Sequence, residues 1–242
     1  MKRVGMLVLF ASVLLGCNKV APVYWENIEI RKEGNGVEAV LNYPYRFGGV
    51  DSVSTKINMC VENELKMDID DSCPSCSLDS VLTAFIEAKG KDSILLPVPY
   101  AFNSDGVVYR LKDVASVKLE KVYYTGGANN DWQVVFLNFD MKTGDLLSEE
   151  DMFTSVDELT AMVQKKFAAR YAERDTTDRF VLFDEIDPDK IPLAANIGLT
   201  PEGVVVFYNL YEIAPRSSGQ TEIVIPYSEI RPLLKFEVVE DK

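Results

Sequence analysis

Residues 115–145, which read ASVKLEKVYYTGGANNDWQVVFLNFDMKTGD, decide the fold of this 242-residue chain. They contain two runs rich in β-branched and aromatic residues, at 115–124 and 132–139, and such runs are typical of β-strands. The segment between them is rich in glycine and asparagine, which favours a turn, and a second turn is predicted at 140–145. The stretch therefore predicts an antiparallel β-meander near the middle of the chain.

The part of the chain before this meander combines a hairpin with helices. Asn35-Gly36 stands between two alternating runs, and this dipeptide is the strongest short signal for a hairpin. A helix is predicted at about 52–67, and a second helix is expected to be capped by Ser77 and to end at Gly90. The first helix would bury one stripe of side chains, namely Val53, Ile57, Cys60, Val61 and Leu65.

The part after the meander predicts one long helix and several short elements. Ser155 and Glu158 have the spacing of a capping box at the start of that helix. The short elements are a hairpin at 197–210, strands at 180–183, 221–226 and 236–239, and a helix capped by Ser228 that runs through Leu234. The mixture indicates an α+β fold of two small packed subdomains, with antiparallel sheets and segregated helices.

The first 17 residues resemble a lipoprotein signal peptide. A basic start at Lys2 and Arg3 precedes an apolar run that is too short to cross a bilayer comfortably. The run ends in Leu14-Leu15-Gly16-Cys17, which resembles the bacterial lipobox. That resemblance implies removal of residues 1–16, lipidation of Cys17 and a lipidated tether over 17–24. An ordinary cleaved signal peptide with a chance cysteine is the alternative.

The two residues after Cys17 bear on the location. Asn18 and Lys19 provide neither an aspartate retention signal nor an acidic export run. We therefore expect a cell-envelope protein that is attached to the membrane through the lipid on Cys17. The periplasmic face of the outer membrane is favoured over the cell surface.

Charge and composition limit the possible partners and chemistry. The chain has a formal net charge of −13 and contains no histidine. A surface of this kind repels nucleic acid and attracts basic proteins, so no nucleic-acid binding is expected. Without histidine there is no Ser-His-Asp or Cys-His machinery and no histidine metal site. No metal and no cofactor is predicted, whereas carboxylate, lysine or tyrosine chemistry stays open.

Three cysteines follow Cys17, and an exported protein permits a disulfide between two of them. Cys73 and Cys76 have CxxC spacing but lack the strand-to-helix context of a redox site. A structural bridge is favoured, either from Cys60 to one member of this pair or between Cys73 and Cys76. The odd number leaves one thiol free.

Several ordered motifs resemble the extracytoplasmic domain of the anti-sigma factor RsiV and the non-catalytic N-terminal region of PdaC-type peptidoglycan deacetylases. The motifs lie at 124–130, 138–144, 151–153, 202–219 and 225–230. The resemblance covers residues 124–234 well and 26–123 more loosely. It implies a PdaC-like subdomain at 25–123 and an RsiV-like subdomain at 124–242. Asn129 stands where the family commonly has histidine, so any role of that histidine is not carried over.

The resemblance implies a non-enzymatic binding module, because the RsiV ectodomain binds lysozyme and the chain shows no deacetylase domain or sigma-binding segment. A basic protein such as lysozyme, or a peptidoglycan fragment, is the expected partner. The candidate contact surface comprises Ala128, Asn129, Asn130, Asp131, Tyr211, Arg216 and Gln220.

Two other functions are alternatives to binding. The first is a cell-wall glycan hydrolase that would use two carboxylates. The acids available for it are Glu149, Glu150, Asp151, Asp184, Glu185 and Asp187. No pair among them has a spacing that points to catalysis, and acidic clusters are usually solvated loops. The second is a structural or assembly lipoprotein.

Overall fold

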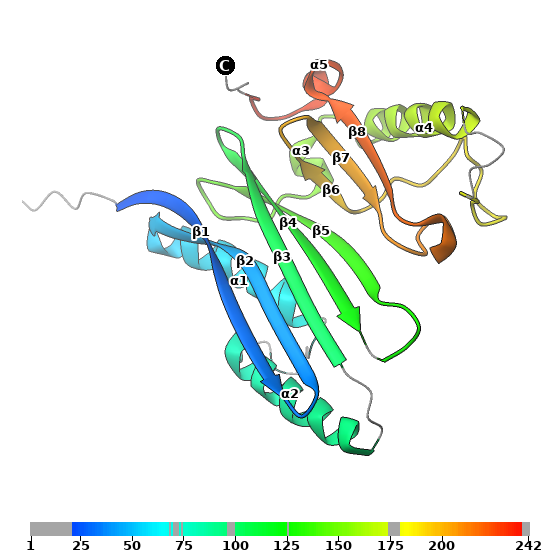
Figure 1. The fold of residues 1–242 in the computed structure, drawn as a ribbon. Helices are drawn as coiled ribbons and strands as arrows, with labels where there is room; N and C mark the ends of the chain where they lie inside the picture. Colours follow the sequence, from blue (N-terminus) through cyan, green and yellow to red (C-terminus); the bar gives the residue numbers. More distant parts are fainter. Residues whose placement is uncertain are drawn as a thin grey trace, which may run out of the picture.

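Two β-sheets with helices packed against them form the molecule, as the α+β prediction required (Figure 1). The computed structural model describes residues 21–67, 69, 73, 75–95, 100–124, 126–173 and 180–238. The predicted signal peptide, Cys17 and the first residues of the tether lie outside this part of the chain. No helix among the described residues combines the length and the apolar character that crossing a membrane requires.

The larger sheet has five strands in the order β1-β2-β3-β4-β5. Neighbouring strands are antiparallel except for β2 and β3, which are parallel and are joined by the long crossover connection that such a pair needs, here α1 and α2. The strands are β1 (Ala21–Gly34), β2 (Val37–Gly49), β3 (Tyr100–Arg110), β4 (Val114–Tyr124) and β5 (Asp131–Asp140). The predicted hairpin is confirmed, since Asn35 and Gly36 turn β1 into β2 with φ angles of 51° and 79°.

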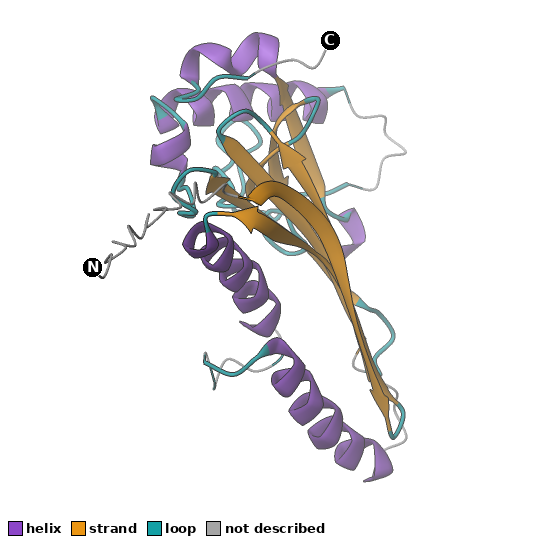
Figure 2. Ribbon diagram, turned by 90° about the vertical axis from the view of Figure 1, so that its left-hand side faces the viewer, coloured by secondary structure: helices purple, strands orange, loops and turns teal. Residues whose placement is uncertain are grey.

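Two helices, α1 (Asp51–Met67) and α2 (Leu78–Leu95), cover one face of this sheet (Figure 2). The predicted stripe of α1 is buried, except that Cys60 is only half-buried. Ile57, Val61 and Leu65 are fully buried and belong to one core cluster with Leu41 of β2 and Phe102 of β3. This core fixes which side chains of each strand face the helices and which face outward.

The predicted end of α2 at Gly90 is wrong, because the helix continues to Leu95. A Cβ atom on Gly90 would lie only 2.9 Å from the Cβ of Asn35 in the β1–β2 turn. The glycine therefore lets the hairpin turn approach the middle of a helix, instead of ending the helix. The predicted cap is present, since the Ser77 hydroxyl accepts a hydrogen bond from the Ser80 N–H at 3.2 Å.

The smaller sheet has three antiparallel strands in the order β6-β7-β8. They are β6 (Ile197–Leu199), β7 (Gly203–Tyr208) and β8 (Thr221–Pro226). The helices of this half are α3 (Glu149–Met152), α4 (Val156–Ala172), η1 (Arg216–Ser218), α5 (Tyr227–Ile230) and η2 (Arg231–Leu233). Ser155 caps α4 by accepting from the Glu158 N–H, whereas the reciprocal capping box lies at Ser148 and Asp151 of α3.

Three short elements differ from their prediction. Residues 180–183 form no strand, because the Ser218 side chain bonds both the N–H and the C=O of Val181 at 2.9 Å. The short helix α5 begins at Tyr227, with Pro226 as its N-cap residue, so Ser228 is not the cap. Residues 236–238 lie after η2 without strand structure.

The two sheets pack against each other through β5 and β7. On one face of β7, Val204, Val206 and Tyr208 belong to the core under α4. On the other face, Val205 and Phe207 form a small cluster with Val134 and Phe136 of β5. The five-stranded sheet also crosses the subdomain boundary expected after residue 123, because β5 pairs with β4 along its whole length.

Candidate functional site

Side-chain amides close the free edge of β5. The Asn209 Oδ1 accepts from the Val134 N–H at 2.8 Å, and its Nδ2 donates to the Val134 carbonyl at 2.9 Å. The Asn196 Oδ1 accepts from the Phe136 N–H at 2.9 Å, and its Nδ2 also donates to the Val134 carbonyl, at 2.8 Å. A carboxamide carries N–H donors and a carbonyl acceptor side by side, so it can bond a strand edge as a peptide group does. No strand in the described part of the chain pairs with this edge, and the two asparagines take the place of one.

The same arrangement continues toward the start of β5. The Gln220 Nε2 donates to the Trp132 carbonyl at 3.1 Å and lies 3.2 Å from the Asn209 Oδ1. The Arg216 guanidinium donates to the Asn130 carbonyl and, at 3.1 Å, to the Asp131 carboxylate. The segment between β7 and β8 is thus fastened to residues 130–132 at the start of β5.

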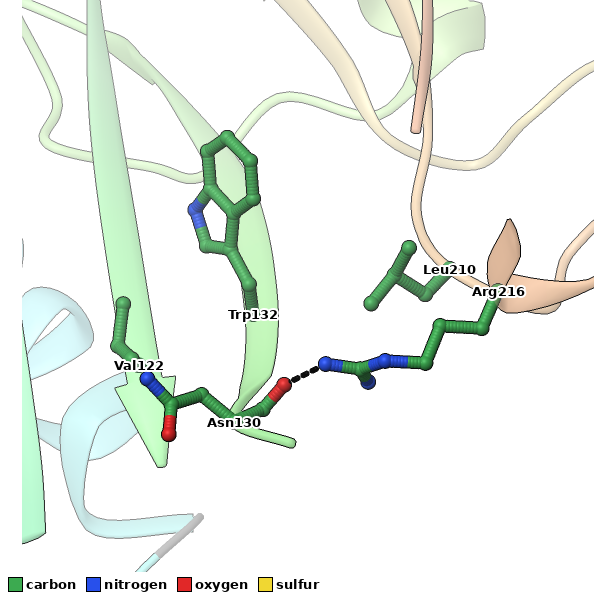
Figure 3. A pocket seen from close by; sticks show the side chains of 5 residues that line it. All are labelled: Val122, Asn130, Trp132, Leu210 and Arg216. Atoms are coloured by element: carbon green, nitrogen blue, oxygen red, sulfur yellow. Dashed lines mark hydrogen bonds between the residues drawn. The ribbon is translucent and has the colours of Figure 1, made fainter. Parts of the chain in front are cut away.

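An open groove lies at this junction (Figure 3). Its volume is about 440 Å³, and it is lined by Val122, Asn130, Trp132, Leu210 and Arg216. A second hollow of about 260 Å³ shares Trp132 and Leu210 with it and adds Tyr211. Trp132 is 46% exposed, although tryptophan is among the most costly side chains to leave in water. We call the two hollows together the Trp132 groove.

Tyr211 occupies an unusual backbone conformation at the rim of the groove. Its φ angle is +70°, a left-handed conformation that few residues other than glycine adopt. The side chain is 59% exposed, so burial of the ring does not compensate for the strain. Strain of this kind costs on the order of 1 kcal/mol and gathers at binding sites. The backbone of Tyr211 therefore independently marks this rim as a candidate site.

The outer face of the larger sheet, opposite α1 and α2, leads from β1 to the groove. Side chains along β4 and β5 alternate between the face covered by the helices and the outer face. Val122 and Trp132, which pair with each other in register, lie on the outer face. The charged residues in register on this outer face include Glu29, Arg31, Glu33, Glu38, Asp105, Lys118 and Glu120. Arg31 and Lys118 are each already paired with an acid of the same face, at 2.5 Å. The face beside the groove is therefore net acidic.

The structure assembles part of the predicted contact surface. Asn130, Asp131, Arg216 and Gln220 meet around the start of β5, and Tyr211 lies beside them. Ala128 and Asn129 are exposed in the loop between β4 and β5. Sequence reasoning missed Trp132 and Leu210.

The reason for that omission is physical. Trp132 alternates with Val134 and Phe136, which are buried, so its pattern predicts a core residue. Leu210 continues the apolar run of the predicted 204–210 strand. Only the exposure of Trp132 in the folded chain identifies the groove, and no local sequence signal carries that information.

The cysteines adopt the second of the two pairings left open by the sequence. Cys73 and Cys76 form a disulfide, and Cys60 is a free thiol. Burial raises the pKa of the Cys60 thiol, and the charge of Glu64 raises it further. The protonated, half-buried thiol is a poor nucleophile.

Two of the acids named for the hydrolase alternative, Asp151 and Asp187, hold local structure. The Asp151 carboxylate accepts from the N–H and the hydroxyl of Ser148, at 3.0 and 2.9 Å, and these bonds lower its pKa. The Asp187 carboxylate accepts from the Asp189 N–H at 2.9 Å within its own turn. Glu149 lines a small cavity of about 130 Å³ beside α3. Among the described residues, no group of three or more Asp, Glu, Cys or His side chains has an arrangement that could hold a metal ion.

Residues 145–228 match a protein family described as "Protein of unknown function (DUF3298)". The match lies within the segment 124–234 on which the resemblance to RsiV and PdaC-type proteins rests, and that finer resemblance stays a prediction. No curated protein sequence matches the chain.

Two solved structures share the fold. A member of the DUF3298 family from Bacteroides fragilis has 17% sequence identity and a TM-score of 0.62, over 90% of this chain and 95% of that one. A DUF3298 family protein from Pseudomonas aeruginosa has 19% identity and a TM-score of 0.59, over 89% of this chain and 94% of that one. At this level of identity the likeness establishes a common fold.

Proposed function

We propose that this protein is a lipid-anchored binding module of the bacterial cell envelope, whose contact surface is the Trp132 groove and whose partner is a basic protein. Exposure of Trp132 beside the strained, exposed Tyr211 is the observation that carries the proposal. Tryptophan, tyrosine and arginine dominate the energetic centres of protein interfaces, and Arg216 supplies the third type.

Charge supports a basic partner. The chain carries a net charge of −13, and the acidic outer face of the sheet leads directly to the groove. Opposite charges on two proteins raise their association rate and guide the partner to the site. Aromatic side chains in the groove would then supply the contacts that hold the partner in place.

Calorimetry with a lysozyme as the basic protein tests the binding proposal. We expect heat of binding at low salt that weakens at high salt, because salt screens exposed charges. Trp132→Ala should weaken binding at least about tenfold, as expected for a central interface residue. Tyr24→Ala, which removes a similarly exposed ring from β1, is the matched control and should leave the affinity unchanged. Absence of heat at low salt would exclude lysozyme as the partner.

The anchoring proposal has its own test. Cys17→Ser should abolish incorporation of a palmitate analogue in bacterial cells and release the protein from the membrane fraction. Cys60→Ser is the matched control, because Cys60 is the free thiol of the folded domain. If the Cys17→Ser variant stays in the membrane fraction as the Cys60→Ser control does, anchoring through Cys17 is contradicted.

A further inference from the structure

An exposed aromatic and aliphatic patch lies at the start of β1, where the chain enters the sheet. Tyr24 is 51% exposed and stacks on Phe47 of β2 with ring centroids 5.2 Å apart. Phe47 in turn contacts the ring of Tyr45 at 4.9 Å. Val50, which follows β2 directly, is 54% exposed. We call Tyr24, Phe47 and Val50 the N-terminal patch.

The patch and the Trp132 groove lie at opposite ends of the sheet. Ala21 pairs with Gly49 at one end of the β1–β2 hairpin. The register can be followed across the sheet from Trp132 to β1. Trp132 pairs with Val122, Val122 with Asn103, Asn103 with Val40, and Val40 with Arg31 of β1. Arg31 lies ten residues along β1 from Ala21, which corresponds to roughly 33 Å at about 3.3 Å per residue.

The length of the tether places the patch close to any lipid on Cys17. Only four peptide steps separate Cys17 from Ala21. Four residues span at most about 14 Å when fully extended. An acylated Cys17 would therefore keep the start of β1 within that distance of the membrane interface. Tyrosine favours this interface, because its ring is apolar and its hydroxyl is polar.

We infer that the N-terminal patch rests on the phospholipid interface and that the sheet stands away from the membrane, presenting the Trp132 groove to the space beyond. This inference rests on the proposed anchoring through Cys17. The patch supplements the lipid and sets the orientation of the domain. A single flexible lipid tether alone would leave the orientation free.

The two tryptophans of the chain report on the two ends of the sheet. Trp25 follows Tyr24 in β1 and pairs with Arg46, whereas Trp132 lies in the groove. The full lipidated protein would be placed in vesicles of phosphatidylcholine with brominated acyl chains, which quench nearby indole emission. Trp132→Phe leaves Trp25 as the single indole fluorophore, and Trp25→Phe leaves Trp132.

We expect Trp25 emission to fall at least about twofold in brominated vesicles, and Trp132 emission to stay within about a tenth of its value in unbrominated ones. In the Trp132→Phe background, Tyr24→Ser with Val50→Ser should remove most of the Trp25 quenching while the protein still floats with the vesicles. The matched control, Val181→Ser, changes an equally exposed valine and should leave the quenching intact.

Protein that floats with the vesicles but shows equal quenching at both positions, or none at Trp25, would overturn the inference and leave the anchoring standing. Protein that fails to float overturns the anchoring, and the inference with it. Loss of binding to a basic protein, measured by calorimetry, concerns the groove and is independent of both readouts.

Discussion

The two edges of the five-stranded sheet are protected in different ways. At the β5 edge, Asn196 and Asn209 bond the peptide groups of Val134 and Phe136 through their side chains. At the β1 edge, no strand among the described residues pairs with β1, and exposed charged side chains, among them Glu29 and Arg31, line the strand. One edge is closed by specific partners, and the other discourages partners by charge.

This difference shows how the two halves of the molecule depend on each other. Closure of β5 depends on residues more than fifty positions away in the sequence, so the smaller sheet must be folded before that edge is satisfied. The charged side chains of β1 belong to the strand itself, so they oppose pairing with another strand whether or not the smaller sheet has folded. Substitutions at the two edges should therefore differ in kind, with loss of stability at β5 and gain of self-association at β1.

The largest effect is expected from Gly198→Ala, which breaks the approach of β6 to β5. A Cβ atom at this position would lie 2.0 Å from the Cδ1 of the buried Phe136 ring. Because neither sheet can move aside cheaply, we expect unfolding in urea to require about 3 kcal/mol less free energy. Gly127→Ala is the control, since its Cβ would meet only the Asn129 carbonyl at 4.0 Å, and it should change stability by less than about 0.5 kcal/mol.

Asn209→Ala opens the β5 edge without disturbing the packing of the sheets. The Val134 N–H then loses its partner in a residue that is only 1% exposed. An unsatisfied buried donor costs about 2 kcal/mol, and urea unfolding should show that loss. The same change at Asn103, an exposed position on β3, should be neutral within about 0.5 kcal/mol. Equal losses for both variants would argue against a special role for the edge amides.

Tyr227 gives a smaller effect that depends on pH. Its hydroxyl donates to the Thr200 carbonyl at 2.8 Å and fastens the β6–β7 turn. Burial, with the charge of Glu202 as a second cause, raises the pKa of Tyr227 from 10.0 to about 12. The unfolded chain loses this proton first, so the stabilisation is complete below pH 10.0 and is lost as the pH rises toward about 12.

Replacement of this tyrosine tests that linkage. Tyr227→Phe should cost about 1 kcal/mol at neutral pH through the lost hydrogen bond. It should also make the decline of stability above pH 10 shallower, which urea unfolding across the alkaline range would measure. An alkaline decline that is as steep in the variant as in the original protein contradicts the prediction.

The β1 edge should respond in association and hardly in stability. Glu29→Val with Arg31→Val removes two charges from the open strand, and the Arg31–Glu38 pair that is lost is exposed and therefore weak. We expect a change in unfolding free energy within about 0.5 kcal/mol, together with dimers or larger species in light scattering. Glu87→Val with Lys91→Val makes the same change of charge on the exposed face of α2. This control should change neither the unfolding free energy nor the association state.

Local signals predicted much of this fold. Asn35-Gly36, the stripe of α1 and the cap at Ser155 each depend on residues close together in sequence, and each has the structure expected of it. Gly90 shows the limit of such signals. Its meaning depends on Asn35, which is distant in sequence and reaches it only in the folded chain.

The candidate site shows the same limit. The glycine- and asparagine-rich turn and the segment around Tyr211 and Arg216 could be named from sequence, because exposed turns are recognisable. The sequence could not predict that these two segments meet around Trp132, since their meeting requires that Asn209 and Gln220 bond to the edge of β5. The parallel pairing of β2 with β3 likewise depends on how α1 and α2 cross the sheet.

The side-chain closure of β5 has a consequence for biosynthesis. All five strands of the larger sheet have been made once Asp140 is added, but Asn209 follows only later in the sequence. At 5–20 residues per second, that interval lasts roughly 3 to 14 s. A larger sheet that formed in this interval would have an open β5 edge, which the finished protein closes with Asn196 and Asn209. Delaying the formation of this sheet until the rest of the chain is present would avoid exposing that edge.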